Sequence, residues 1–104
     1  MLPGFRTPIA RGKPGKGELS GFHPAHLLAQ VFDGTVERAG IDPAEVEQVI
    51  AGCVTQAGEQ AGNLARIAWL ARNRGWGTGG TTVDSQCGSG QQANHLIRAL
   101  VQAG

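Results

Sequence analysis

Cys87 is the residue of this 104-residue sequence whose type and surroundings point most directly to chemistry. It lies in Val83-Asp-Ser-Gln-Cys-Gly-Ser-Gly90, between a short β-forming run and an amphipathic helix. At a helix N-terminus, the dipole favours thiolate over thiol, and unpaired N–H groups can bind a developing oxyanion. The position therefore predicts a nucleophile that accepts an acyl group. A small buried residue that packs the strand-to-helix corner explains the position equally well.

The remaining candidates for chemistry are three histidines and one further cysteine. His95 lies about two helical turns beyond Cys87, roughly 12 Å at 1.5 Å per residue, which is too far to hydrogen-bond the sulfur. It is predicted to be a polar or interface histidine, and His23 and His26 are expected in solvent beside a helix start. Cys53 falls in an apolar run and is predicted to be a buried structural cysteine. The distant cysteines lack the paired spacing of zinc ligands, so no metal site is predicted.

Three stretches show the apolar spacing of helices, and their ends carry capping residues. Pro24 suits the first position of the first helix, and Gly40 suits a left-handed cap at its end. Asn63 can cap the second helix. The third is the clearest, because its apolar side chains recur at i, i+3, i+4, i+7 and i+8: Ala93, Leu96, Ile97, Leu100 and Val101.

The strands between these helices predict the fold class. Residues 49–54 are apolar on both faces, which is typical of a central strand in a mainly parallel sheet, and residues 81–83 form a second, brief strand. Residues 75–80 are predicted to be a flexible connection, and 1–21 an extended arm before a helix-strand-helix-strand-helix unit at 22–104. This order predicts an α/β layered domain with helices packed on the sheet. Two short strands cannot complete that sheet, so the domain is predicted to be incomplete.

Composition limits the classes of partner. The formal charge of +1 gives no general attraction to nucleic acid or to an anionic membrane surface. No apolar run approaches the roughly 20 residues that span a bilayer, and no signal peptide is evident, so the protein is predicted to be cytosolic. Trp69 and Trp76 are predicted to anchor the core or an interface.

The Cys87 segment, Thr82-Val-Asp-Ser-Gln-Cys-Gly-Ser-Gly90 followed by Gln92-Ala93, resembles the nucleophile segment of the thiolases. The resemblance continues upstream in the family's order and spacing. It covers Arg6-Thr-Pro-Ile9, Arg38-Ala-Gly-Ile-Asp-Pro43, Val49-Ile-Ala-Gly-Cys-Val-Thr-Gln56, and then Gln60, Asn63 and Arg66.

This resemblance implies that Cys87 accepts an acyl group from an acyl-coenzyme A, with its own backbone N–H in an oxyanion hole. The implied reaction is cleavage of a 3-ketoacyl-CoA by coenzyme A, as in fatty acid metabolism, or the reverse condensation of two acyl-CoA molecules. Coenzyme A thioesters are then substrates, and no bound cofactor or cofactor-binding residue is predicted. The resemblance also implies a homo-oligomer or pairing with another thiolase chain.

The family's histidine base, second catalytic cysteine and coenzyme-binding loop have no counterpart in these residues. The expected chain is therefore a truncated thiolase that is inactive alone. Two alternatives stay open: a non-catalytic module that pairs with a full-length thiolase, and part of a condensing enzyme of the ketoacyl synthase type. The Arg-Thr-Pro and Gln-Ala-Gly-Glu-Gln patterns favour the thiolases over the second alternative.

Overall fold

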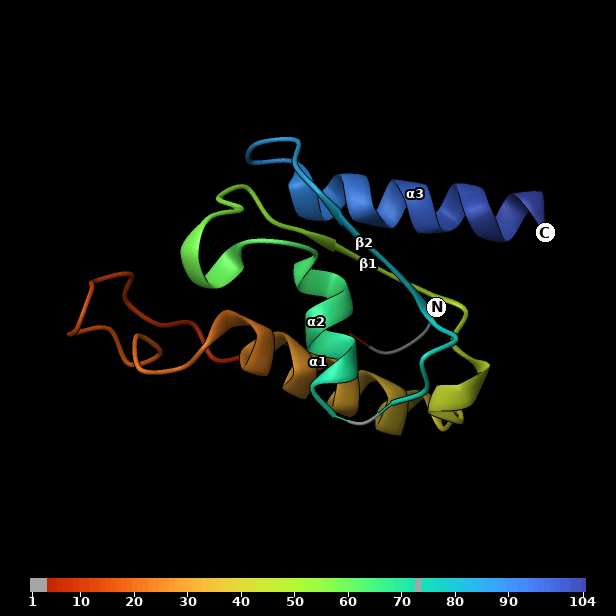
Figure 1. Ribbon diagram of the computed structural model, residues 1–104, viewed down its shortest axis with the longest axis horizontal. Helices are drawn as coiled ribbons and strands as arrows, with labels where there is room; N and C mark the ends of the chain where they lie inside the picture. The colour runs from red at the N-terminus through yellow and green to blue at the C-terminus, as the bar shows by residue number, and fades with distance from the viewer. Residues whose placement is uncertain (1–3, 73) are drawn as a thin grey trace.

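The computed structural model describes residues 4–72 and 74–104. Over these residues, three α-helices, two strands and two short 3-10 helices follow one another (Figure 1). In order they are α1 (Pro24–Ala39), η1 (Pro43–Glu45), β1 (Gln48–Gly52), η2 (Gly58–Gln60), α2 (Leu64–Leu70), β2 (Gly79–Val83) and α3 (Ser89–Ala103). This is the predicted order of the three helices and two strands, and the two 3-10 turns lie between them.

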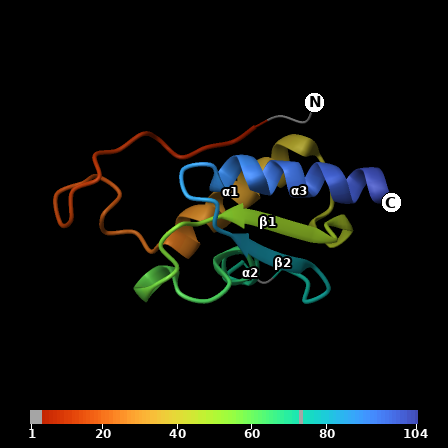
Figure 2. The same cartoon turned by 90° about the horizontal axis from the view of Figure 1, so that it is seen from above.

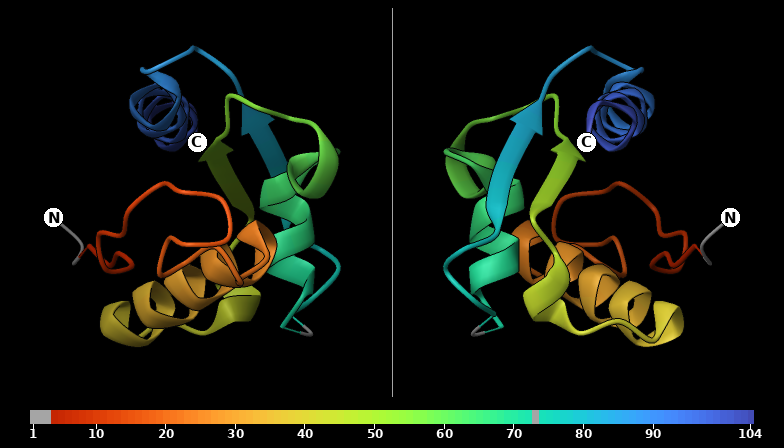
Figure 3. Two further views of the ribbon diagram at one scale, coloured as in Figure 1. Left: turned by 90° about the vertical axis from the view of Figure 1, so that its left-hand side faces the viewer. Right: turned by 90° about the vertical axis from the view of Figure 1, so that its right-hand side faces the viewer.

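The two strands form a parallel sheet, in which Gln48 lies opposite Gly79 and Gly52 opposite Val83. Figure 2 shows both arrows pointing the same way. Figure 3 shows α3 on one face of the sheet, and α2 on the other with α1 packed beside it. The layered α/β class predicted from the sequence is confirmed.

The predicted central position of the first strand is wrong for this chain. Over the described residues the sheet has two strands, so β1 has β2 as its one neighbour. The strand is apolar on both faces because α3 covers one face and α2 the other. A strand that is apolar on both faces indicates that helices cover both faces. It does not indicate how many strands lie beside it.

The predicted flexible connection ends earlier than expected, because the last two of its residues belong to β2. The Gly79 N–H donates to the Glu47 carbonyl at 2.7 Å. A Cβ atom on Gly80 would lie 2.7 Å from Cβ of Arg66, so α2 packs against the bare backbone of the strand. These glycines act as a packing surface.

Local signals at the helix ends are confirmed. Pro24 opens α1, and the cap Gly40 has φ 65°. The Asn63 side chain accepts the Arg66 N–H at the start of α2. The structure also shows a capping box of Asp42 and Glu45 around η1.

The core lies between α1, α2 and the sheet. Trp69 is fully buried and meets the ring of Phe32 edge to face, with centroids 5.7 Å apart. It thus belongs to the core, as predicted. Trp76 does not, since it is 80% exposed on the connection that leads to β2.

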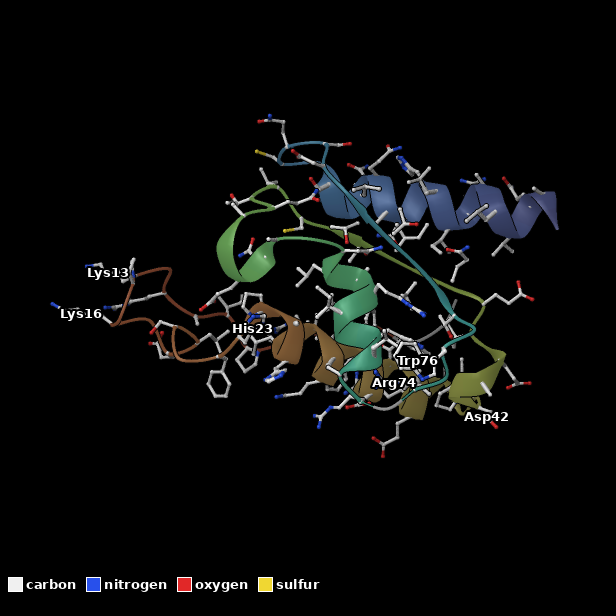
Figure 4. The ribbon with its side chains drawn as sticks, in the orientation of Figure 1. Lys13, Lys16, His23, Asp42, Arg74 and Trp76 are labelled. Carbon is white, nitrogen blue, oxygen red and sulfur yellow. The ribbon has the colours of Figure 1, made fainter. Side chains whose placement is uncertain are left out.

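A buried arginine ties this connection to the helices. Arg74, labelled in Figure 4, forms an ion pair with Asp33 of α1, and its guanidinium carbon lies 4.7 Å from the centroid of the Trp69 ring. Arg72 contacts the same carboxylate at 3.0 Å from the solvent side. Burial lowers the pKa of Arg74 from its ordinary value, because desolvation disfavours the charged form.

Residues 4–23 form an arm of turns and irregular segments that runs past α1. Phe5 packs over Gly34, where a Cβ atom would come within 2.6 Å of the ring, and Arg38 stacks on the same ring at 4.7 Å. Lys13 and Lys16 lie at the far end of the arm (Figure 4). Within residues 4–72 and 74–104, no helix is both long and apolar enough to cross a membrane.

Candidate active site

Cys87 lies in the turn that follows β2, one residue before Gly88, which caps α3. The structure thus places it between a strand and a helix, as the sequence predicts. Its side chain is exposed. Exposure contradicts the alternative in which Cys87 is a buried packing residue, and it leaves the sulfur open to a substrate.

Hydrogen bonds hold the turn from within. The N–H of Gln86 donates to Oδ1 of Asp84 at 2.8 Å, and the N–H of Gly88 donates to the Ser85 carbonyl at 3.0 Å. The Ser89 hydroxyl crosses the turn: it accepts the Ser85 N–H at 2.9 Å and donates to the Gln86 carbonyl at 2.6 Å. The backbone around the cysteine is therefore fixed by its neighbours.

Gln86 adopts φ 54° and is the one non-glycine residue with positive φ in the described chain. Side chains adopt this left-handed conformation rarely, and it persists where surrounding contacts impose it. Here the contacts of Asp84 and Ser89 impose it, and the next residue is Cys87.

Two N–H groups of the helix start are already used. Those of Gly88 and Ser89 donate to the carbonyls of Ser85 and Gln86. The N–H of Cys87 makes no hydrogen bond to any residue that the structure describes. It is therefore a donor next to the sulfur that can meet an oxyanion.

Gly52, at the end of β1, packs against the backbone that follows the Cys87 turn. A Cβ atom there would lie 2.4 Å from the carbonyl carbon of Ser89 and 2.5 Å from the nitrogen of Gly90. The first turn of α3 thus rests directly on the end of β1, and only glycine permits this contact. The apolar pattern of residues 49–54 gave no sign of it.

Cys53 corrects a second prediction. It lies just after β1 and is half-buried, not buried within the strand. Its thiol lies 3.3 Å from Oε1 of Gln60 and 3.7 Å from the carbonyl of Thr55. The strand ends at Gly52, two residues earlier than predicted, so the Cys53 side chain meets polar groups of the following loop.

A polar network joins α2 to β2. The Thr82 hydroxyl donates to Oδ1 of Asn63 at 2.9 Å and accepts the Ala65 N–H at 3.0 Å, while Nδ2 of Asn63 donates to the Gly80 carbonyl at 2.7 Å. Arg66 donates to the carbonyls of Trp76 and Thr78. The network fixes the strand that leads to Cys87. The sequence marks Asn63 as a helix cap but does not show its bonds to the strand.

The histidines do not gather at the cysteine. His23, labelled in Figure 4, caps α1: its Nδ1 accepts the Ala25 N–H at 3.1 Å. The centroids of the His23 and His26 rings lie 5.7 Å apart. His95 is exposed on α3. Over residues 4–72 and 74–104, no hydrogen bond reaches the Cys87 sulfur, and no three His, Cys, Asp or Glu side chains form a metal-binding group.

Comparisons with known proteins agree with this arrangement. Residues 2–104 match the model of the family described as Thiolase, N-terminal domain. The steroid 3-ketoacyl-CoA thiolase FadA6 of Mycobacterium tuberculosis is 54% identical over 104 residues, which are all of this chain and 25% of the relative.

Two solved structures share the fold. The acetyl-CoA acetyltransferase of Bacillus anthracis matches with a TM-score of 0.72 and 37% identity over 78% of this chain and 20% of its own. The Acat5 thiolase of Ascaris suum, solved in complex with coenzyme A, matches with a TM-score of 0.78 and 21% identity over 86% of this chain and 23% of its own. The chain spans about a quarter of the length of the curated relatives it matches. On these grounds, the chain belongs to the thiolase family and corresponds to part of its N-terminal domain.

Proposed function

We propose that Cys87 is the nucleophile of a thiolase-type acyltransferase and accepts an acyl group from a coenzyme A thioester. The observation that carries the proposal is the exposed thiol in a braced turn at the carboxyl end of β2. The match to the thiolase N-terminal domain, which includes this segment, supports it.

The chemistry begins with attack of the Cys87 sulfur on the thioester carbonyl carbon. A carbon–sulfur bond forms, and the carbonyl electron pair moves to oxygen, where the Cys87 N–H meets it. When the oxyanion collapses, the bond to the coenzyme A sulfur breaks, and that thiolate takes a proton equivalent to the one that Cys87 lost. The product is an acylated Cys87 and free coenzyme A.

The acyl class is proposed from the relatives. FadA6 is named a steroid 3-ketoacyl-CoA thiolase, and the Bacillus anthracis neighbour is named an acetyl-CoA acetyltransferase. A 3-ketoacyl-CoA with a steroid acyl group is therefore the first substrate to test for thiolysis, with acetoacetyl-CoA beside it. The direction of the reaction and the cytosolic location stay predictions.

Full turnover is proposed to need groups that these residues do not supply. Among residues 4–72 and 74–104, no side chain hydrogen-bonds the Cys87 sulfur, so no base is in contact with it there. Acylation of Cys87 by a thioester is consequently the half-reaction expected from this chain, and thiolysis of acetoacetyl-CoA is not expected.

A second candidate function is a module that pairs with a longer thiolase chain. Leu100 and Val101 on α3 are 49% and 77% exposed, and the described sheet has two strands. Coexpression with a full-length thiolase followed by size-exclusion chromatography tests this candidate, which a monomeric elution would contradict.

The experiment for the main proposal is acylation by acetyl-CoA, with the modified residue identified by peptide mass spectrometry. We expect one acetyl group on Cys87 in the unaltered chain and in Cys53→Ala, and none in Cys87→Ala. Acetylation that is equal on both cysteines would refute the assignment of Cys87.

A further inference from the structure

Ser89 is a buried polar residue whose hydroxyl makes two hydrogen bonds within the turn that carries Cys87. It is 5% exposed, and a buried hydroxyl is costly unless it is hydrogen-bonded. The hydroxyl acts both as acceptor and as donor within the turn: it accepts the Ser85 N–H at 2.9 Å and donates to the Gln86 carbonyl at 2.6 Å. The hydroxyl thus closes the loop that carries Cys87.

The Ser89 hydroxyl donates to the carbonyl of Gln86, which is the residue of the turn with a strained backbone conformation. Gln86 has φ 54°, and its carbonyl accepts both the hydroxyl and the N–H of Ser89. Because Cys87 follows directly, the left-handed Gln86 sets the direction in which the N–H and the side chain of Cys87 leave the turn.

Ser89 is itself held by the sheet. Its carbonyl carbon approaches so near to Gly52 that a Cβ atom there would be 2.4 Å away. The line of support therefore runs from β1 through Ser89 and Gln86 to Cys87. The Ser89 hydroxyl makes two of the side-chain hydrogen bonds in this line, and Oδ1 of Asp84, which accepts the Gln86 N–H, makes another.

We infer that Ser89 is a positioning residue for acyl transfer to Cys87, an inference that rests on the proposed function. Without the hydroxyl, the Ser85 N–H and the Gln86 carbonyl lose this partner and the turn relaxes. Acyl transfer needs the sulfur and the Cys87 N–H aligned on one carbonyl group. Alkylation by iodoacetamide forms no oxyanion and needs only an accessible thiol.

The test compares two reagents on the same sulfur in the full chain. Phenyl thioacetate transfers an acetyl group and releases thiophenol without needing a coenzyme site, and iodoacetamide alkylates. In Ser89→Ala we expect acetylation of Cys87 to slow by about tenfold or more, while alkylation changes by less than about twofold. Ser89→Thr keeps the hydroxyl and is expected to restore most of the acetylation rate.

Asn94→Ala is the matched control, because it also removes one polar side chain from the first turns of α3, where Nδ2 of Asn94 donates to the Gly90 carbonyl at 3.1 Å. Its acetylation rate is expected to stay that of the unaltered chain. Amide hydrogen exchange of Ser85 in the unaltered chain gives a second measurement that needs no variant: we expect protection, and exchange at the rate of an open loop would overturn the inference.

The outcomes separate the two proposals. Acetylation that Ser89→Ala leaves unchanged, or that falls equally with alkylation, overturns the positioning role while Cys87 keeps its function. Absence of acetylation at Cys87 in the unaltered chain removes the proposed function and this inference with it.

Discussion

The backbone N–H of Cys53 donates to the carbonyl of Val83 at 2.9 Å, one position beyond the last paired residue of β1. This bond extends the parallel pairing to the point where the two chain segments leave the sheet. Cys53 begins one of these segments, and the turn with Cys87 belongs to the other. The two thiols thus sit beyond the same end of the sheet in different surroundings.

We predict that iodoacetamide labels Cys87 at least about fivefold faster than Cys53 in the folded chain. Cys87 is exposed, whereas the Cys53 thiol is half-buried and contacts Gln60 at 3.3 Å. Peptide mass spectrometry over a time course measures both rates. In concentrated urea the two rates should converge, and equal slow labelling of the folded protein would contradict the prediction.

Gly52→Ala is expected to destabilise the protein by about 2 kcal/mol, because the new methyl group meets the backbone of Ser89 and Gly90 at less than 3 Å. The free energy of unfolding from urea titrations followed by circular dichroism measures this. Gly90→Ala is the matched control: a Cβ atom there meets nothing within 4 Å, and a helical alanine is expected to stabilise by roughly 0.5 kcal/mol. Equal effects of the two changes would show that α3 does not rest on β1.

Arg74→Ala is expected to cost about 3 kcal/mol of unfolding free energy, because the side chain is buried against Trp69 and pairs with Asp33. Arg72→Ala should cost less than about 1 kcal/mol, since its pair with the same carboxylate is half-exposed. Urea titration of both variants under one set of conditions tests this difference. A larger loss for Arg72→Ala would reverse the assigned roles.

Acidification is expected to open the loop between Arg11 and Glu18. The carboxylate of Glu18 accepts the Arg11 N–H at 3.0 Å, and backbone hydrogen bonds lower the pKa of Glu18 from its ordinary value. Since this pKa is lower in the folded state, the contact is fully present above the ordinary value and is lost as pH falls through the folded one. The amide chemical shift of Arg11 should therefore titrate with a midpoint below that of a free glutamate.

Glu18→Gln supplies the control, because its side chain does not ionise in this range. The Arg11 amide of this variant should show no acid transition. A transition of the same size and midpoint in the variant would assign the effect to another group.

Features set by neighbouring residues were predictable from the sequence. Pro24 and Gly40 mark the ends of α1 because capping depends on the residues next to the helix. The position of Cys87 between strand and helix follows from the same local signals. Asn63 was also identified as a cap, since a side-chain oxygen at that place accepts an N–H two or three residues later.

Features that join distant parts of the chain were not predictable. Gly80 enters β2 because α2 packs on it, and Gly52 is bare because α3 rests on it. No local pattern announces either contact, nor the pairing of Arg74 with Asp33. The role of Ser89 could not be predicted for a related reason. A serine near a helix start is common, and only the folded turn shows that its hydroxyl bonds to Ser85 and Gln86.

The two-stranded sheet has a consequence for handling the protein. Over the described residues, β1 and β2 each face their partner on one side. Apart from the Gly80 carbonyl, which accepts Nδ2 of Asn63, their outer main-chain groups are left for another extended chain to meet. Such an edge is a template for strand addition and so for aggregation, unless a longer chain or a partner covers it. Dilute preparations and short incubations are accordingly the conditions under which the single chain can be studied.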